Sequence, residues 1–591
     1  MLFGAELHDD GVAFRLWAPS RERADVIVDG AEHALEPRAG GWFERTVRDA
    51  RAGSRYAFAF PGVDVRVPDP ASRFQPDGVH APSEVVDPRA YAWQESRWHG
   101  RPWHEVVLYE LHVGTFTPEG TYAAAVARLD VLADLGVTAV ELMPLAQPAG
   151  DRNWGYDGVL PFAPQRTYGT PDELKAFIEA AHARGLCVFL DVVYNHFGPE
   201  GNYLNVFAEP FFTERHHTPW GAAINVDAHE AEVVREFFVQ NSLYWLREYR
   251  FDGLRYDAVH EIRDDAPRPF LDELAARVRA GVEPGRAVHL VLENDANEAR
   301  WLDRYDAQWN DDAHHAFHVL TTGEADGYYR DYAREPARLL ARALAEGFAY
   351  QGEPSPHRRG APRGEPSAAL PSTAFVDFLQ NHDQVGNRAF GERLGALAPE
   401  AAVRAATAVL LLAPAIPLLF MGEEWAASTP FLFFTDFGGE LARAVTEGRR
   451  CEFRAWPSFA DPATRDRIPD PQDPATMRAS ALRWDERARP QHTAMLALHR
   501  ELLALRAELI VPRLASGAYG VGFQLLGATA FEVRWRFGNG ARLTLIANLG
   551  AQPATVSYAA EGARIFTLGD VHASAGAAAL APWSAGWFLA P

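Results

Sequence analysis

The chain has 591 residues, which predicts about two to four domains. Hydrophobic residues make up 48% and charged residues 23%, a composition that excludes disordered and fibrous proteins. The 57 basic and 79 acidic side chains give a formal net charge of −22. Such a chain repels phosphate backbones and anionic lipid, so we expect neither nucleic acid nor a membrane as a partner.

Cysteine and lysine are scarce, and this excludes several kinds of site. The two cysteines, Cys187 and Cys451, cannot form a disulfide framework or a cysteine-rich zinc site. Residues 1–11 lack the basic and apolar stretches of a secretory signal, so we expect a cytoplasmic protein. Lys175, the single lysine, fits no phosphate-loop motif, and we expect it on the solvated face of a helix.

The first part of the chain reads as a β-domain. Short runs of alternating apolar residues are separated by Gly, Pro and Asp. They occupy residues 11–19, 24–30, 41–47 and 54–60. A proline-rich stretch, residues 67–78, follows them. The pattern predicts an N-terminal β-sandwich domain over residues 1–95.

From about residue 105, apolar strand-like runs alternate with amphipathic helical patterns. Eight such runs are present, at residues 105–116, 137–145, 185–196, 253–260, 289–295, 306–311, 373–383 and 417–425. Repeated β-α units with continuously apolar strands indicate a parallel sheet. We therefore predict an α/β fold, a (β/α)₈ TIM barrel with loop insertions over residues 96–508. An open, doubly wound sheet is less well supported because no strand leads into a glycine-rich nucleotide turn.

One long apolar run, residues 405–422, reaches the length of a membrane span. Pro414 and Pro417 lie inside it, so we predict a buried helix that ends near Pro414 and then a short buried strand. Residues 351–367 are rich in Pro and Gly and predict a surface loop. A helix over residues 496–509 is expected to end the barrel, and short β-like runs predict a small C-terminal β-domain over residues 509–591.

Polar residues follow four of the predicted barrel strands. In a barrel these strand ends meet at one rim, where active sites lie. A single Asp there is usually a turn former or a helix cap, but several buried carboxylates are costly unless they are paired or functional. The residues are Asp191, Asn195 and His196; Arg255, Asp257 and His260; Glu293, Asn294 and Asp295; and Asn381, His382 and Asp383.

Four of these segments resemble known signatures. DVVYNH, FDGLRYDAVH, LEND and QNHD are similar to the four signature regions of the α-amylase superfamily of glycoside hydrolases, in the expected order. The resemblance covers roughly residues 105–508. Further passages, among them YELHVGTFTPEGTY and MGEEWAASTPFLFFTDF, resemble the superfamily's trehalohydrolase family, whose members release trehalose from maltooligosyltrehalose.

The resemblance implies a retaining hydrolase that cuts the α-1,4 bond next to the terminal trehalose. It assigns Asp257 as nucleophile, Glu293 as general acid and base, and Asp383 as a third carboxylate that holds the ring hydroxyls. A retaining pair lies about 5–5.5 Å apart. We expect Arg255, on the same face of its strand as Asp257, to keep that carboxylate ionised, and burial to raise the pKa of Glu293.

The expected substrate-binding residues surround these carboxylates. His196 and His382 are expected to bond to hydroxyls of the scissile glucose. Tyr156 either stacks on that glucose or packs its own loop, and Trp220 either contacts the trehalose or anchors its loop. Asp191 and Asn195 are expected to support the carboxylates.

We predict no cofactor and no required metal. The expected substrates are maltooligosyltrehalose and related α-1,4-glucans. We expect a monomer, paired in function with a maltooligosyltrehalose synthase.

Three rival functions remain open at this point. A 1,4-α-glucan branching enzyme would have the same domain order, but its first signature is usually closer to DWVPGHF than to DVVYNH. A debranching enzyme of the same superfamily is the second rival. A non-catalytic glucan-binding protein is the third, although it would be expected to have lost one of Asp257, Glu293 and Asp383.

Overall fold

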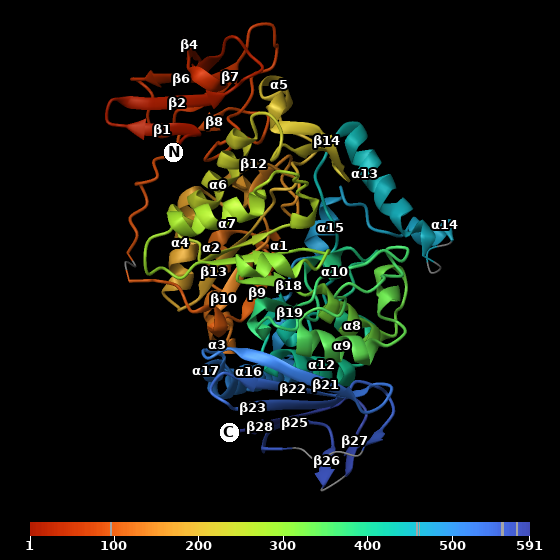
Figure 1. Cartoon of the computed structure of the whole chain (residues 1–591). Coiled ribbons are helices and arrows are strands. Elements are labelled where there is room, and N and C mark those ends of the chain that lie inside the picture. Colours follow the sequence, from red (N-terminus) through yellow and green to blue (C-terminus); the bar gives the residue numbers. More distant parts are fainter. Residues whose placement is uncertain (95–96, 457–458, 460, 557–560, 575–576) are drawn as a thin grey trace.

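The computed structural model describes residues 1–591 except 95–96, 457–458, 460, 557–560 and 575–576. Three parts follow one another along the long direction of the molecule (Figure 1). N-terminal antiparallel sheets lie at one end, a barrel with its helices lies in the middle, and C-terminal antiparallel sheets lie at the other end.

The middle part is a closed barrel of eight parallel strands, as predicted, and the open-sheet alternative is wrong. Neighbouring strands follow the chain order, and the last strand pairs with the first. The strands are β9 (Leu108–Leu111), β10 (Ala139–Leu142), β13 (Cys187–Val192), β16 (Gly253–Tyr256), β17 (His289–Leu292), β18 (Ala307–Trp309), β19 (Phe375–Phe378) and β20 (Ile416–Phe420).

Every residue of these strands is buried, because helices cover the outer face and side chains fill the interior. The longer helices are α3 (Leu129–Leu135), α4 (Pro171–His182), α6 (Ala231–Arg247), α7 (Phe270–Gly281), α8 (Asp311–Thr322), α9 (Pro336–Glu346), α12 (Glu400–Leu412), α13 (Gly439–Glu452) and α16 (Pro490–Leu505).

Shorter elements complete the barrel part. They are α1 (Val113–Phe116), α2 (Tyr122–Val126), α5 (Leu204–Phe207), α10 (His382–Gly386), α11 (Leu394–Leu397), α14 (Pro462–Arg465), α15 (Pro474–Ala479), α17 (Val511–Leu514), and the hairpins β11 (Ala146–Pro148) with β12 (Gly158–Pro164) and β14 (Phe212–Thr218) with β15 (Gly221–Ile224).

The N-terminal part consists of two four-stranded antiparallel sheets. One has the order β1-β2-β6-β5 and the other β4-β3-β7-β8. Phe14 of the first sheet contacts Tyr56 of the second, with ring centroids 4.9 Å apart, so the sheets share a core. The strands are β1 (Gly4–His8), β2 (Gly11–Trp17), β3 (Asp25–Val28), β4 (Ala31–Ala34), β5 (Glu36–Pro37), β6 (Trp42–Val47), β7 (Arg55–Ala59) and β8 (Ser83–Glu84).

The C-terminal part has a five-stranded sheet, β21-β22-β23-β28-β25, and a three-stranded sheet, β24-β27-β26. Trp535 and Trp587 stack in its core and donate from Nε1 to carbonyls of Leu344 in α9 and Ala408 in α12. The strands are β21 (Ala518–Leu525), β22 (Ala530–Phe537), β23 (Arg542–Asn548), β24 (Ala554–Val556), β25 (Ala563–Leu568), β26 (Val571–Ser574), β27 (Ala577–Leu580) and β28 (Ser584–Ala590).

The long apolar run forms α12 and β20, which confirms a helix followed by a strand. Within the described part of the chain, no helix combines the length and the apolar character needed to cross a membrane.

The prediction for Lys175 is wrong. Its side chain is fully buried on α4, 3.4 Å from the Glu248 carboxylate and over the Tyr249 ring, and it donates to the Pro88 carbonyl. The segment before the barrel covers this face of the helix, which no local pattern in the sequence indicates.

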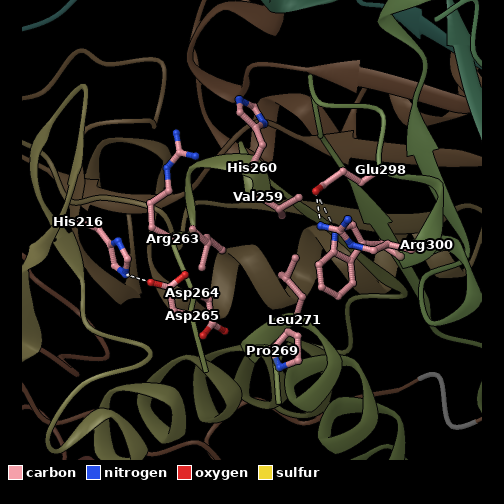
Figure 2. Close-up of a pocket in the computed structure, with 12 residues that line it drawn as sticks. His216, Val259, His260, Arg263, Asp264, Asp265, Pro269, Leu271, Glu298 and Arg300 are labelled. Atoms are coloured by element: carbon pink, nitrogen blue, oxygen red, sulfur yellow. Dashed lines mark hydrogen bonds and ion pairs between the residues drawn. The ribbon is translucent and has the colours of Figure 1, made fainter. Parts of the chain in front are cut away.

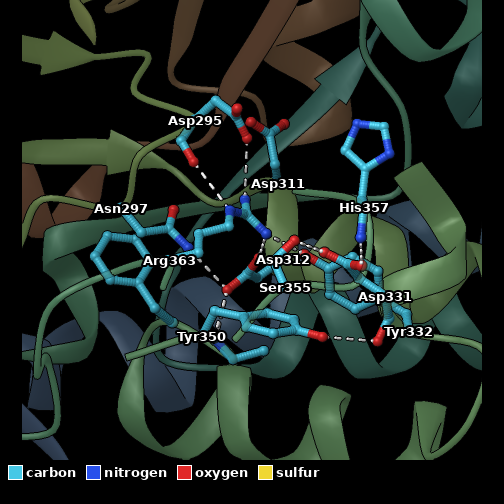
Figure 3. A network of polar contacts seen from close by, with 12 residues as sticks. Asp295, Asn297, Asp311, Asp312, Asp331, Tyr332, Tyr350, Ser355, His357 and Arg363 are labelled. Atoms are coloured by element: carbon cyan, nitrogen blue, oxygen red, sulfur yellow. Dashed lines mark hydrogen bonds and ion pairs between the residues drawn. The ribbon is translucent and has the colours of Figure 1, made fainter. Parts of the chain in front are cut away.

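The prediction of a surface loop over residues 351–367 is wrong in part. Ser355, Arg363 and Ser367 are buried. Arg363 donates to Asp312 at the start of α8 at 2.8 Å and pairs with Asp295 at 3.3 Å (Figure 3). The ion pairs of Arg363 with Asp312 and Asp295 therefore hold this segment against the rim of the barrel.

Candidate active site

The predicted carboxylates meet in one hollow. Asp257 follows β16, Glu293 follows β17 and Asp383 lies in α10 after β19, and all three line one hollow of about 380 Å³. We name it the catalytic hollow after the roles predicted for these carboxylates. Tyr156, His196 and Trp220 also line it. Arg255 and His382 are buried and contact the carboxylates, without belonging to the lining.

One guanidinium connects three carboxylates. Arg255 is fully buried, and its Nη1 donates to Asp257 Oδ1 at 2.8 Å and to Asp191 Oδ2 at 2.6 Å. Its Nη2 lies 3.5 Å from Glu293 Oε2. Buried negative charge needs such compensation. Asn195 Nδ2 donates to Asp257 Oδ2 at 2.8 Å, so two side chains fix the orientation of this carboxylate.

The Glu293 carboxyl lies in surroundings that favour its protonated form. Burial raises the pKa of Glu293, the negative charges of Asp257 and Asp383 add to this, and Arg255 opposes it. The backbone N–H of Ala258, a residue in the left-handed region with φ 40°, donates to its Oε2. A carboxyl with a raised pKa can donate a proton at a pH where an ordinary one has lost it.

Asp383 is paired with His382, whose positive charge is stabilised by the Glu110 carboxylate at the other ring nitrogen. His382 Nε2 lies 3.4 Å from Asp383 Oδ1, and Nδ1 contacts the Glu110 carboxylate in β9. Burial lowers the pKa of His382, but Asp383 and Glu110 raise it more, and the net pKa lies well above the ordinary value. Burial raises the pKa of Asp383, but the charge and hydrogen bond of His382, together with Arg255 and Asn387, lower it below the ordinary value, so this carboxylate stays ionised.

Two aromatic residues line the hollow, and each stacks on a histidine. The Tyr156 ring stacks on the His382 ring at 4.9 Å, and its hydroxyl donates to Asp191 at 2.6 Å. The half-exposed Trp220 ring stacks on the His196 ring at 4.1 Å and 3°. Both rings are thus held by contacts within the protein and also border the space for a ligand. For both residues, contact with sugar and packing of the loop therefore both stay predictions.

Further carboxylates, not predicted from the sequence, lie near the three predicted ones. Asp311 begins α8, two residues after the end of β18, and its pKa is raised well above the ordinary value by burial and then by the charges of Glu293 and Asp295. The signal that could have found Asp311 is the polar end, Asn310 and Asp311, of the strand-like run predicted at residues 306–311. Glu110 and Glu141 lie inside strands β9 and β10, where no strand-end rule applies.

A second hollow, the β16–β17 hollow, adjoins the first. It has a volume of about 490 Å³ and shares His260 with the catalytic hollow. Figure 2 shows His216, Arg263, Asp264 and Glu298 around it. Most of its lining follows β16 and β17, the strands that also carry Asp257 and Glu293.

Three side chains at this second hollow could hold a cation by position: His216, Asp227 and Asp265. Arg215 already lies 3.5 Å from Asp227 and 3.7 Å from Asp265. Its guanidinium supplies the positive charge that the two carboxylates require, so the donor set does not fit a metal ion well.

Comparison with known proteins agrees with this geometry. The family model "Alpha amylase, catalytic domain" matches residues 88–220, and "Domain of unknown function (DUF3459)" matches residues 520–587. A solved structure described as a putative alpha amylase from Salmonella typhimurium is 45% identical, with a TM-score of 0.93 over 100% of this chain and 99% of that chain.

Curated relatives identify the family of this chain more narrowly than the family models do. The malto-oligosyltrehalose trehalohydrolase of Deinococcus radiodurans is 45% identical over 84% of this chain and 81% of its own length. That of Arthrobacter ramosus is 41% identical over 95% of this chain and 96% of its own. A 1,4-alpha-glucan branching enzyme of Burkholderia thailandensis matches only 43% of this chain, at 34% identity. The chain therefore belongs to the malto-oligosyltrehalose trehalohydrolase family, whose fold and signatures are those of the α-amylase family of glycosidases.

Proposed function

We propose that the protein releases trehalose from maltooligosyltrehalose by hydrolysing the α-1,4 bond next to the terminal trehalose, with retention of configuration. The observation that carries this proposal is the placement of Asp257 and Glu293 on the two terminal nitrogens of one buried guanidinium, Arg255. Hydrolysis with retention needs a nucleophilic carboxylate and an acid close together, and this arrangement supplies both.

In the proposed reaction, Asp257 attacks the anomeric carbon of the scissile glucose and forms a covalent glycosyl-enzyme. Glu293 donates its proton to the leaving oxygen, so trehalose departs as a neutral sugar. Glu293 then accepts a proton from the water that attacks the intermediate, and Asp257 leaves as a carboxylate. The raised pKa of Glu293 supports its role as the acid in the first step.

Asp383 and His382 are proposed to hold the hydroxyls of the scissile glucose. An ionised carboxylate accepts from hydroxyl groups, and charge-assisted hydrogen bonds of this kind are stronger than neutral ones. His196 is proposed to bond to another hydroxyl of the same glucose, because burial lowers its pKa and leaves a neutral ring with one donor and one acceptor nitrogen.

The β16–β17 hollow is proposed to receive the leaving trehalose. The leaving group must adjoin the acid, and this hollow is lined by the segments that follow the strands of Asp257 and Glu293. Trp220, on the β14–β15 hairpin that also carries His216, is proposed to contact the trehalose from the neighbouring catalytic hollow.

Product analysis tests the proposal. The protein is incubated with maltotriosyltrehalose beside maltopentaose, and the released sugars are separated by chromatography. We expect trehalose and maltotriose from the first substrate and slow turnover of the second. Glucose and maltose from both at similar rates would indicate a general amylase, and new α-1,6 branches in amylose would indicate a branching enzyme.

A further inference from the structure

The loop after β17 begins directly after the Glu293 carboxyl. This β17 loop, residues 294–298, forms neither helix nor strand, and Asn297 within it lies in the left-handed region with φ 54°. Such a loop has no ladder of strand or helix bonds, so its position depends on contacts with other segments. Those contacts bear on Glu293, because a catalytic side chain keeps its place only where its surroundings hold it.

Arg363 holds the β17 loop at Asp295, two residues after Glu293. The Nε of Arg363 donates to the Asp295 carbonyl at 3.0 Å, and its Nη2 lies 3.3 Å from Asp295 Oδ1. The arginine is 4% exposed. Two nitrogens of one planar, buried guanidinium therefore fix both the backbone and the side chain of Asp295.

The same guanidinium connects the β17 loop to a helix of the barrel. Arg363 Nη1 donates at 2.8 Å to Asp312 Oδ1 at the start of α8 (Figure 3). The Asp312 side chain is fully buried, and its Oδ2 accepts from Asn297 Nδ2 at 2.9 Å. The loop is thus tied to α8 at two points, at Asp295 through Arg363 and at Asn297 directly.

The backbone around Arg363 leaves this arrangement little freedom. The N–H groups of Gly364 and Glu365 donate to the carbonyls of Ala296 and Asn297 at 3.1 and 3.0 Å. Gly364 has φ +85°, and an added Cβ would come within 1.9 Å of the Tyr350 carbonyl oxygen. The segment that carries Arg363 is therefore packed closely between the β17 loop and the chain after α9.

We infer that Arg363 is a positioning residue for the general acid. This inference rests on the proposed function, which assigns Glu293 as the acid. Arg363 lies outside the linings of the catalytic and β16–β17 hollows, as the described residues define them, so it acts through the loop and not on the substrate. An acid must lie within hydrogen-bond reach of the leaving oxygen, and a misplacement of about 1 Å can lower the rate about 100-fold.

Arg363→Met tests this role, because it removes the guanidinium and keeps an unbranched side chain. Asp312 would retain four other donors in the variant, namely the Tyr332 hydroxyl, Asn297 Nδ2 and the N–H groups of Ala349 and Tyr350. We expect kcat for maltotriosyltrehalose to fall about 10- to 100-fold, with KM changed less than about twofold. The first-step rate on an aryl α-maltoside, measured by stopped flow, should change less than about threefold, because this leaving group needs no proton.

Two further variants separate positioning from a structural role. Arg342 holds the beginning of the same segment, where it donates to the Ala349 carbonyl at 2.9 Å and to Glu353 at 2.6 Å. Arg342→Met is therefore the matched control and should leave both rates near those of the wild type. Arg363→Lys keeps a charge beside Asp312 but lacks the planar pair of nitrogens for Asp295. It should unfold near the wild-type temperature and still show the low kcat on maltotriosyltrehalose.

The deciding quantity is the ratio of kcat on maltotriosyltrehalose to the first-step rate on the aryl substrate. A wild-type ratio in folded Arg363→Met, whether both rates fall together or neither falls, would overturn the inference, and so would full recovery of kcat in Arg363→Lys. If Arg363→Met does not fold, Arg363→Lys decides by the same ratio. The proposed function would survive each of these results, because it fails only if the wild type releases no trehalose from maltotriosyltrehalose.

Discussion

His382 donates two hydrogen bonds to the carboxylate of Glu110, from its backbone N–H at 3.0 Å and from Nδ1 at 2.5 Å. Both residues are 1% exposed, and the opposite nitrogen of the imidazole faces Asp383. The carboxylate inside the barrel thus fixes both the position and the charge of the histidine at the rim. A ligand that bonds to His382 therefore contacts a cation, because the buried Glu110 carboxylate favours the protonated imidazole.

Glu110→Gln should lower stability in a pH-dependent way. The folded-state pKa of His382 is raised, so its contribution to stability is fully present below the ordinary value of about 6.5 and is lost as pH rises through the folded value. Removing one partner of a buried pair costs about 3 kcal/mol. Urea unfolding at pH 6 and pH 10 should show a larger difference between wild type and variant at pH 6. An equal difference at both pH values would contradict the assignment.

Glu293→Gln should lower kcat for maltotriosyltrehalose by about 10³-fold, because it removes the proton donor. The same variant should retain most of its first-step rate on an aryl α-maltoside, whose leaving group needs no proton. Stopped-flow measurement of aryl release checks this. Asp257→Asn is the matched comparison, and it should fail on both substrates. A rate on the aryl substrate as low as on the natural one would argue against the role of Glu293 as acid.

The pH profile of the wild type should reflect the raised pKa of Glu293. The acid works only while protonated, so kcat/KM should hold to a pH above the ordinary value of about 4.5 and fall as pH rises through the raised pKa. On the aryl substrate, where no proton is needed, the alkaline fall in the first-step rate should move to higher pH. Identical alkaline limbs on the two substrates would mean that another group sets them.

Trp220→Ala separates the two interpretations of this residue. If the indole contacts trehalose, kcat/KM should fall about tenfold for maltotriosyltrehalose and change little for maltopentaose. If it only anchors its hairpin on His196, both substrates should lose equally, and Trp220→Phe should restore both. Parallel assays of the three proteins at the same pH decide between these outcomes.

Glu141→Gln should stabilise the protein above neutral pH. Among the described residues, neither carboxylate oxygen of Glu141 has a hydrogen-bond partner, and its side chain is 1% exposed. Burial raises its pKa well above the ordinary value, and the charges of Glu110 and Asp191 add to this. Such an acid destabilises the fold increasingly as pH rises above about 4.5. The variant should match the wild type at pH 4.5 and exceed it by about 1 kcal/mol or more at pH 8 in urea unfolding.

The barrel and the position of its three main carboxylates could be predicted because both depend on local pattern. Continuous apolar runs mark buried parallel strands, and a polar residue directly after each strand lies at the rim. Asp257 and Glu293 follow this rule closely. The helix in the first part of the long apolar run was likewise predictable, because it ends at Leu412, just before Pro414.

Features that depend on contacts between distant segments could not be predicted in this way. Lys175 is buried by the chain around Pro88, and Arg363 by Asp295 and Asp312. The stacking of Trp220 on His196 joins a hairpin to a strand end. In each case the second partner lies beyond the reach of any local periodicity, and a charged residue in a loop or on a helix ordinarily indicates exposure.

Arg255 has a further consequence for the enzyme in solution. Its guanidinium is fully buried, with the Trp309 ring 4.2 Å away and Asp191, Asp257 and Glu293 around it. Dissolved ions screen exposed charges over about 10 Å at 0.1 M but reach buried pairs far less. The carboxyl groups of Asp257 and Glu293 are thereby shielded from dissolved ions, so on the proposed function turnover should change little with salt concentration.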